Sequence, residues 1–200
     1  IMPTSAEKCK PISLSKIMRL TELTHTAISK VLQPGEIAID ATIGNGHDTS
    51  FLARITGPSG EVHGFDIQAD ALAKTQQLLD KENLAGNVTF HHAGHENMDR
   101  HLPPGTRDKV TAIIFNLGYL PGGDKSCITR KESTLKALHL AFNNYLRPGG
   151  ILSILCYPGH PGGDEESKAV EHWLSALSGA TFETHASGGP ILHLVRKAGL

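Results

Sequence analysis

The chain has 200 residues, of which 39% are hydrophobic, and this is enough for one domain with a full apolar core. No run of about 18 apolar residues is present, which excludes a membrane-spanning helix and predicts a soluble protein. The formal net charge is −1 with a pI near 6.9, so the overall charge does not attract nucleic acid. Any RNA contact must come from local basic groups. The alternative is that these basic residues only form a solvated surface. The candidates are Lys8, Lys10, Lys16, Arg19, Lys125, Arg130 and Lys131.

The chain contains three cysteines, Cys9, Cys127 and Cys156. Their odd number and wide spacing argue against a disulfide framework or a cysteine zinc site and favour a reducing, cytoplasmic location. No signal-peptide pattern is present at the N-terminus, so export is not expected. His91, His92 and His95 lie close together, but adjacent residues of a strand point to opposite faces. We therefore expect no metal site.

Strands and helices alternate along the chain after an irregular arm over residues 1–14. A first helix is predicted from Ser13 or Ser15 to about Leu32, where Gln33-Pro34-Gly35 stops it. Helices are also predicted over 47–55, 69–82, 130–146 and 164–177, the last capped by Asp164, and strands over 37–43, 61–66, 88–91, 110–115, 151–156, 181–184 and 191–196. Short loops between alternating elements predict a three-layer α/β sandwich in a single domain, residues 1–200.

A glycine turn follows the first predicted strand and opens the next helix. Gly44 and Gly46 let the backbone turn sharply and approach a ligand closely. The helix that begins at His47 directs its free N–H groups to the same place, where a carboxylate or phosphate could bind. A turn that merely joins a strand to a helix is the alternative interpretation.

Polar residues end three of the other predicted strands. Asp66 lies about twenty residues beyond the glycines, where such an acid binds ribose hydroxyls, although it could instead cap the helix from Ala69. His95 and Glu96 follow the third strand and are candidates to border the cofactor or substrate, with a surface loop as the alternative for Glu96. Asn116 directly follows the most apolar strand, a position where α/β enzymes place substrate groups.

Several cofactors are compatible with a glycine turn, and the sequence separates them. Thr49 stands in place of the third glycine of a dinucleotide-binding motif, and no Gly-Lys-Ser/Thr follows, which excludes an ATP-binding P-loop. The in-strand Asp40, the glycine turn, Asp66 and an Asn-x-x-Tyr loop from Asn116 together resemble class I S-adenosylmethionine methyltransferases. Asp40 would steady the turn and receive the methionine amino group, directly or through water. A dinucleotide oxidoreductase remains the less favoured alternative.

A closer resemblance is to the YtqB/MnmM family, long catalogued as rRNA methylases, and it extends roughly over residues 24–196. The segments that carry it are 40–49, 65–68, 94–97, 116–124 and 159–163. Thr42 replaces the first glycine of the general class I motif, and residues 188–191 differ from the longer segment of many members. The resemblance implies a Rossmann-like fold with a mostly parallel seven-stranded sheet and an antiparallel last strand. It also implies S-adenosylmethionine-dependent N-methylation of the 5-aminomethyl group of 2-thiouridine at the tRNA wobble position.

The resemblance implies roles for particular residues. Cofactor contacts are expected from His25, Asp40, Thr42, Gly44, Asn45, Gly46, Asp48, Thr49, Asp66, Gln68, His95, Glu96, Asn116 and Gly118. Catalytic roles are expected for Asn116, Tyr119 and His160, and substrate contacts for Leu117, Tyr119, Lys125 and Arg130.

In this hypothesis Asn116 orients the amine and is not a base. Its side-chain oxygen and the Leu117 carbonyl accept hydrogen bonds from the amine, while Tyr119 packs on the uracil ring. His160 or His95 could assist deprotonation. The expected partner is tRNA, held by a homodimer, and an rRNA or small-molecule methyltransferase is the alternative function.

Overall fold

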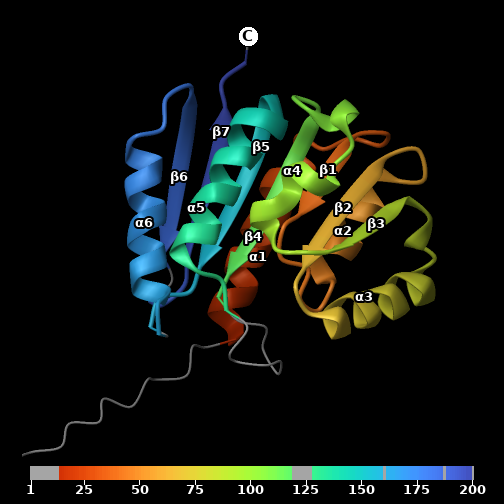
Figure 1. The fold of residues 1–200 in the computed structure, drawn as a ribbon, viewed down its shortest axis with the longest axis horizontal. Helices are drawn as coiled ribbons and strands as arrows, with labels where there is room; N and C mark the ends of the chain where they lie inside the picture. The colour runs from red at the N-terminus through yellow and green to blue at the C-terminus, as the bar shows by residue number, and fades with distance from the viewer. Residues whose placement is uncertain (1–13, 119–127, 160, 187, 200) are drawn as a thin grey trace, which may run out of the picture.

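The computed structural model describes residues 14–118, 128–159, 161–186 and 188–199, which form one seven-stranded sheet with helices on both faces (Figure 1). The strands are β1 (Ile37–Asp40), β2 (Glu61–Asp66), β3 (Val88–His92), β4 (Val110–Leu117), β5 (Leu146–Cys156), β6 (Ala180–Ala186) and β7 (Ile191–Lys197). Their order is β3-β2-β1-β4-β5-β7-β6. Strands β1 to β5 are parallel, and β7 is antiparallel to both β5 and β6. The predicted sheet, including its antiparallel last strand, is confirmed.

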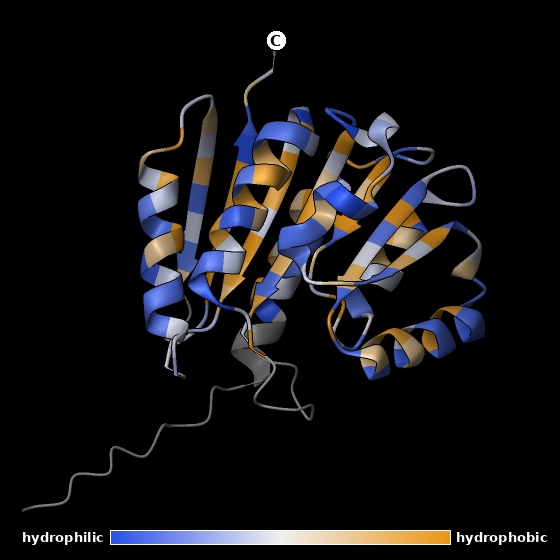
Figure 2. Cartoon of the chain, viewed as in Figure 1, coloured by the Kyte–Doolittle hydropathy of each residue, from blue (hydrophilic) through white to orange (hydrophobic). Residues whose placement is uncertain are grey.

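Two apolar clusters, one on each face of the sheet, make up the core. The helices are α1 (Leu14–Ser29), α2 (His47–Thr56), α3 (Ala69–Glu82), α4 (Met98–His101), α5 (Lys131–Leu140) and α6 (Gly163–Ser175). Helices α4 to α6 contribute Met98, Leu138 and Trp173 to one cluster, whereas α1 to α3 contribute Ile28, Leu52 and Leu79 to the other. Apolar residues gather on the central strands, and the helices turn hydrophilic residues outward (Figure 2). This arrangement is the predicted three-layer sandwich.

Strands β1 and β4 lie at the centre and are buried on both faces, as their unbroken apolar sequences predict. β1 ends at Asp40, earlier than the predicted strand over 37–43. After Asp40 the chain bonds first to β4 and then to β2. The Ala41 N–H donates to the Ile114 carbonyl of β4, and the Ile43 N–H donates to the Phe65 carbonyl of β2. The turn after β1 is therefore fixed between β4 and β2.

Two helix predictions and one strand prediction differ from the structure in detail. The helix predicted over 130–146 is α-helical only to Leu140, and Ala141–Tyr145 forms a π-helical turn. β5 starts at Leu146 instead of Ile151, with a register shift against β4 where the intervening residues bulge out. Asp164 does not cap α6; the N-cap is Gly162 at φ 83°, and Asp164 lies in the first turn. Within the described ranges, no helix combines the length and apolarity that a bilayer crossing requires.

Candidate active site

The glycine turn after β1 is tied to α2 by Asp40, which has no exposed surface. One carboxylate oxygen accepts the Thr42 N–H at 3.2 Å, and the other accepts the Thr49 hydroxyl at 2.6 Å. Gly46 has φ 79°, and a Cβ there would lie 2.5 Å from the Thr75 hydroxyl oxygen. The turn therefore requires glycine for both conformation and space. A direct contact between Asp40 and a ligand would require the turn to open.

Burial raises the pKa of Asp40 to about 7, and the negative charge of Asp48 adds to the increase. The hydrogen bonds from Thr49 and Thr42 act in the opposite direction. A buried carboxylate with a second carboxylate beside it favours a cation nearby, because a positive charge would lower the cost of ionising both. This edge of the sheet is therefore suited to an ammonium group.

Asp66 connects the end of β2 to the same turn. Its two carboxylate oxygens accept the Gly44 N–H and the Gln68 N–H, each at 2.9 Å. It does not cap α3, which starts at Ala69 with Gln68 as its N-cap. Each oxygen of a carboxylate has two lone pairs, so Asp66 retains acceptor capacity for two hydroxyl groups. The geometry fits the predicted role of Asp66 in binding a ribose.

Asp48 is the centre of the network that reaches Asn116. One of its oxygens lies 2.6 Å from His25 Nε2, and the other accepts the Asn116 side-chain amide N–H at 2.8 Å. The Asn116 backbone N–H donates to the Thr42 hydroxyl at 2.7 Å, so both ends of the residue are held. A carboxylate can only accept hydrogen bonds, which fixes the amide nitrogen of Asn116 toward Asp48 and leaves its oxygen as the remaining acceptor. His25 is itself held by stacking on Phe51, with ring centroids 3.7 Å apart.

The three neighbouring histidines have separate partners. His95 is buried, its Nδ1 lies 3.3 Å from the Ala41 carbonyl, and burial lowers its pKa, so the ring is neutral and donates to that carbonyl. His91 pairs with His63, and His92 donates to the Ile67 carbonyl. Among the described residues, no group of His, Cys, Asp and Glu side chains could hold a metal ion. Next to His95, Glu96 is partly buried and accepts a hydrogen bond from the Asn97 side chain.

A second set of polar contacts secures the residues after Asn116. The Gly118 N–H donates to the Thr129 hydroxyl at 2.7 Å, and the Thr129 N–H donates to the Gly118 carbonyl at 2.9 Å. The Thr129 and Thr134 hydroxyls donate to the two oxygens of Glu166, at 2.8 and 2.5 Å. Glu166, from the first turn of α6, is 2% exposed. No sequence pattern indicates these contacts, because they join residues far apart in the chain.

Some predicted site residues are not brought into this network. Tyr119, Lys125 and His160 lie outside the described residues. The Leu117 side chain is buried in the core, so only its backbone could face a substrate. Arg130 is exposed at the N-cap of α5.

The structure adds Tyr157, which directly follows β5 at the same edge of the sheet. Burial raises its pKa to about 12, and the charge of Asp48 contributes, so the phenol is neutral. A signal for Tyr157 was present in the sequence, because it follows an apolar strand as Asn116 does.

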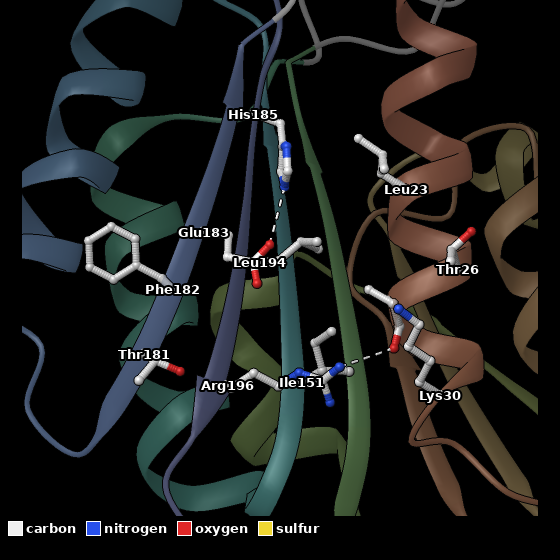
Figure 3. A pocket seen from close by; sticks show the side chains of 11 residues that line it. Leu23, Thr26, Lys30, Ile151, Thr181, Phe182, Glu183, His185, Leu194 and Arg196 are labelled. Carbon is white, nitrogen blue, oxygen red and sulfur yellow. Dashed lines mark hydrogen bonds and ion pairs between the residues drawn. The ribbon is translucent and has the colours of Figure 1, made fainter.

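A groove of about 260 Å³ lies elsewhere, between α1 and strands β6 and β7 (Figure 3). Its walls carry Lys30, Glu183, His185 and Arg196. Glu183 lies 3.5 Å from His185, and the Arg196 guanidinium donates to the Ala27 carbonyl. The groove is separate from the network around Asp48.

Comparison with known proteins places the chain in a family. The model of the family described as "Putative rRNA methylase" matches residues 62–188, which is more than half of the chain. A chloroplastic tRNA (mnm(5)s(2)U34)-methyltransferase of Arabidopsis thaliana is 41% identical over 169 residues, covering 80% of this chain and 60% of that protein. The chain thus spans less than two thirds of the length of that relative.

Two crystal structures share the fold and much of the sequence. One, from Clostridium thermocellum and described in the same words as the family, has a TM-score of 0.82 and 38% identity, covering 88% of this chain and 96% of that one. The other, from Streptococcus mutans and in complex with SAH, is described as a "putative methyltransferase"; its TM-score is 0.78 and its identity 34%, covering 90% of this chain and 98% of that one. The fold is the Rossmann-like fold of class I methyltransferases, as predicted. The chain belongs to the family described as "Putative rRNA methylase".

Proposed function

We propose that the chain is an S-adenosylmethionine-dependent RNA methyltransferase that methylates the 5-aminomethyl nitrogen of 2-thiouridine at the wobble position of tRNA. The observation that carries this proposal is the Asn116 amide, held by Asp48 and Thr42 at the carboxyl end of the central strand β4. The Arabidopsis relative, a tRNA (mnm(5)s(2)U34)-methyltransferase by name, supports the choice of substrate.

The residues at the carboxyl ends of β1 and β2 fit S-adenosylmethionine. Asp66 would bind the ribose hydroxyls, and the glycine turn allows close approach of the backbone. The methionine ammonium group would favour the ionised form of the buried Asp40 carboxyl, whose oxygens already accept hydrogen bonds from Thr42 and Thr49. The Streptococcus mutans structure, in complex with SAH, supports this assignment. When bound, S-adenosylmethionine supplies an electrophilic methyl group.

The protein's main contribution to the reaction is to align the amine. An alkylamine is mostly protonated at neutral pH and must lose a proton before it can attack. The free oxygen of the Asn116 amide accepts a hydrogen bond from the amine and directs its lone pair. An amide does not titrate, so Asn116 is an orienting group. His95 is buried against Ala41, which leaves His160 as the proposed proton acceptor and Tyr119 as the proposed stacking partner of the uracil.

We also propose a homodimeric state, two RNA-contacting residues and a cytoplasmic location. A homodimer is proposed because a net charge of −1 gives one copy little attraction for tRNA. Lys125 and Arg130 are the proposed RNA contacts. A cytoplasmic location is proposed from the few, widely spaced cysteines, whereas the Arabidopsis relative is chloroplastic by name.

Nucleoside mass spectrometry tests the proposal. The purified protein with S-adenosylmethionine should convert aminomethyl-2-thiouridine to its N-methyl form in tRNA from a strain that lacks this methylation. The Asn116→Ala variant serves as the inactive control. Methylation of rRNA with no change in tRNA would establish the alternative, which the family description and a 35% identical ribosomal RNA small subunit methyltransferase H favour. Calorimetry in which NADH binds and S-adenosylhomocysteine does not would overturn both.

A further inference from the structure

We propose that Glu166 is a positioning residue for the RNA substrate, acting through Thr129 on Gly118, two residues after Asn116. This inference rests on the proposed function. It is carried by a chain of hydrogen bonds in which the buried Glu166 holds the Thr129 hydroxyl, and that hydroxyl accepts the Gly118 N–H.

Gly118 and Thr129 are joined in both directions. The Gly118 N–H donates to the Thr129 hydroxyl, and the Thr129 N–H donates to the Gly118 carbonyl. The two contacts use both the N–H and the carbonyl of Gly118. Because Gly118 lies two residues after Asn116, the same contacts fix how the chain leaves the catalytic strand.

The Thr129 hydroxyl needs Glu166 to adopt this orientation. A hydroxyl has one hydrogen to donate, and Glu166 accepts it, so the oxygen lone pairs are left for the Gly118 N–H. Glu166 is held by the hydroxyls of both Thr129 and Thr134, and burial together with the Glu166 charge raises the pKa of Cys156 to about 12. Cys156 is the register partner of Leu117 across β4 and β5. Glu166 is therefore linked through Thr129 to Gly118, two residues after Asn116.

The chain provides a matched control in Thr134. Its hydroxyl also donates to Glu166, but it has no hydrogen bond to Gly118; Thr134 is buried, whereas Thr129 is partly buried. The variants Thr129→Val and Thr134→Val each remove one hydroxyl from the same carboxylate at nearly constant volume. A purely structural role of Glu166 would make them equivalent, whereas a positioning role would separate them.

The experiment compares kinetics and amide hydrogen exchange in the full chain. Thr129→Val should lower kcat/KM for tRNA at least about tenfold, with the affinity for S-adenosylhomocysteine within about threefold of wild type. Thr134→Val should keep kcat/KM within about threefold, and Thr129→Ser should restore it because the hydroxyl is kept. Exchange at the Gly118 amide should accelerate in Thr129→Val and in Glu166→Gln, but not in Thr134→Val.

Two results would overturn the inference: equal losses of kcat/KM in Thr129→Val and Thr134→Val that follow their losses of stability, or unchanged exchange at Gly118 in Thr129→Val. The exchange measurement needs no RNA. If wild type fails to methylate tRNA, the proposed function falls, and faster Gly118 exchange in Thr129→Val still supports the positioning contact.

Discussion

The carboxyl edge of β1, β2 and β4 and the groove beside α1 are built in different ways. At the edge, buried or partly buried polar side chains such as Asp40, Asp48 and Asn116 are held by defined partners before any ligand arrives. In the groove, Glu183 is 77% exposed and pairs only loosely with His185, at 3.5 Å. The two regions therefore differ in how far their polar groups are fixed in advance. Preorganised polar groups with free acceptor capacity suit a catalytic site, which is why we place the proposed site at the edge.

The sharpest test of this contrast is Asn116→Ala. Losing the oriented amide should lower kcat about 100-fold, because the amine lone pair is no longer directed. The affinity for S-adenosylhomocysteine should stay within about threefold, since the glycine turn and Asp66 remain. Steady-state kinetics and calorimetry measure the two quantities. Equal losses in both would refute the orienting role of Asn116.

Asp66→Ala should act mainly on cofactor binding. The variant would lose the proposed hydrogen bonds from the two ribose hydroxyls and also the contact that holds the Gly44 N–H. S-adenosylhomocysteine binding should therefore weaken about 30-fold. Calorimetry measures the dissociation constant. Gln76→Ala on the exposed side of α3 is the matched control and should leave binding unchanged. An Asp66→Ala dissociation constant within twofold of wild type would remove the ribose assignment.

Asp40→Asn should change how stability depends on pH. The pKa of Asp40 is raised from 3.8 to about 7, so the folded state holds its proton more tightly than the unfolded state. The stabilisation of the folded state that comes from this proton is complete below about pH 4, falls as pH rises, and is lost above about pH 7. Between pH 5.5 and 7 wild type should lose about 1.5 kcal/mol relative to Asp40→Asn.

Urea unfolding at a series of pH values measures this difference. Glu183→Gln in the groove is the control and should show the same slope as wild type. If Asp40→Asn and wild type have parallel profiles, Asp40 is ionised in the folded state throughout that range.

The smallest effects should come from the groove. Lys30→Ala should change stability by less than about 0.5 kcal/mol and kcat/KM for tRNA by less than about twofold, because the side chain is exposed. A tenfold loss of tRNA methylation in this variant would make the groove part of the RNA-binding surface and end the contrast between the two regions.

Much of the architecture could be predicted from local patterns. Strand β2 and helix α3 have the predicted limits, since a β-branched or amphipathic run bounded by glycine or asparagine determines them locally. The start of α6 could not be predicted from Asp164, because capping depends on the backbone at Gly162. The sequence of the π-helical turn at Ala141–Tyr145 carries no distinct signal.

The site divides in the same way. The sequence indicated Asp66 and Asn116 because each ends a strand, and parallel strands share one carboxyl edge. It could not show that Asp48 would join His25 to Asn116, or that Glu166 would hold Thr129, because these pairs come from elements distant in sequence. Such contacts depend on how helices pack over the sheet, which short-range spacing does not encode.

The position of β7 has a consequence for biosynthesis. β7 lies between β5 and β6 and is the last of the described strands to be made, so β6 has no strand to pair with until residues 191–197 are synthesised. A nascent chain that stops before Ile191 leaves one edge of β5 and all of β6 without backbone partners. Ribosome-bound intermediates of that length should be preferred clients of chaperones, and release of the last strand should complete the sheet in one step.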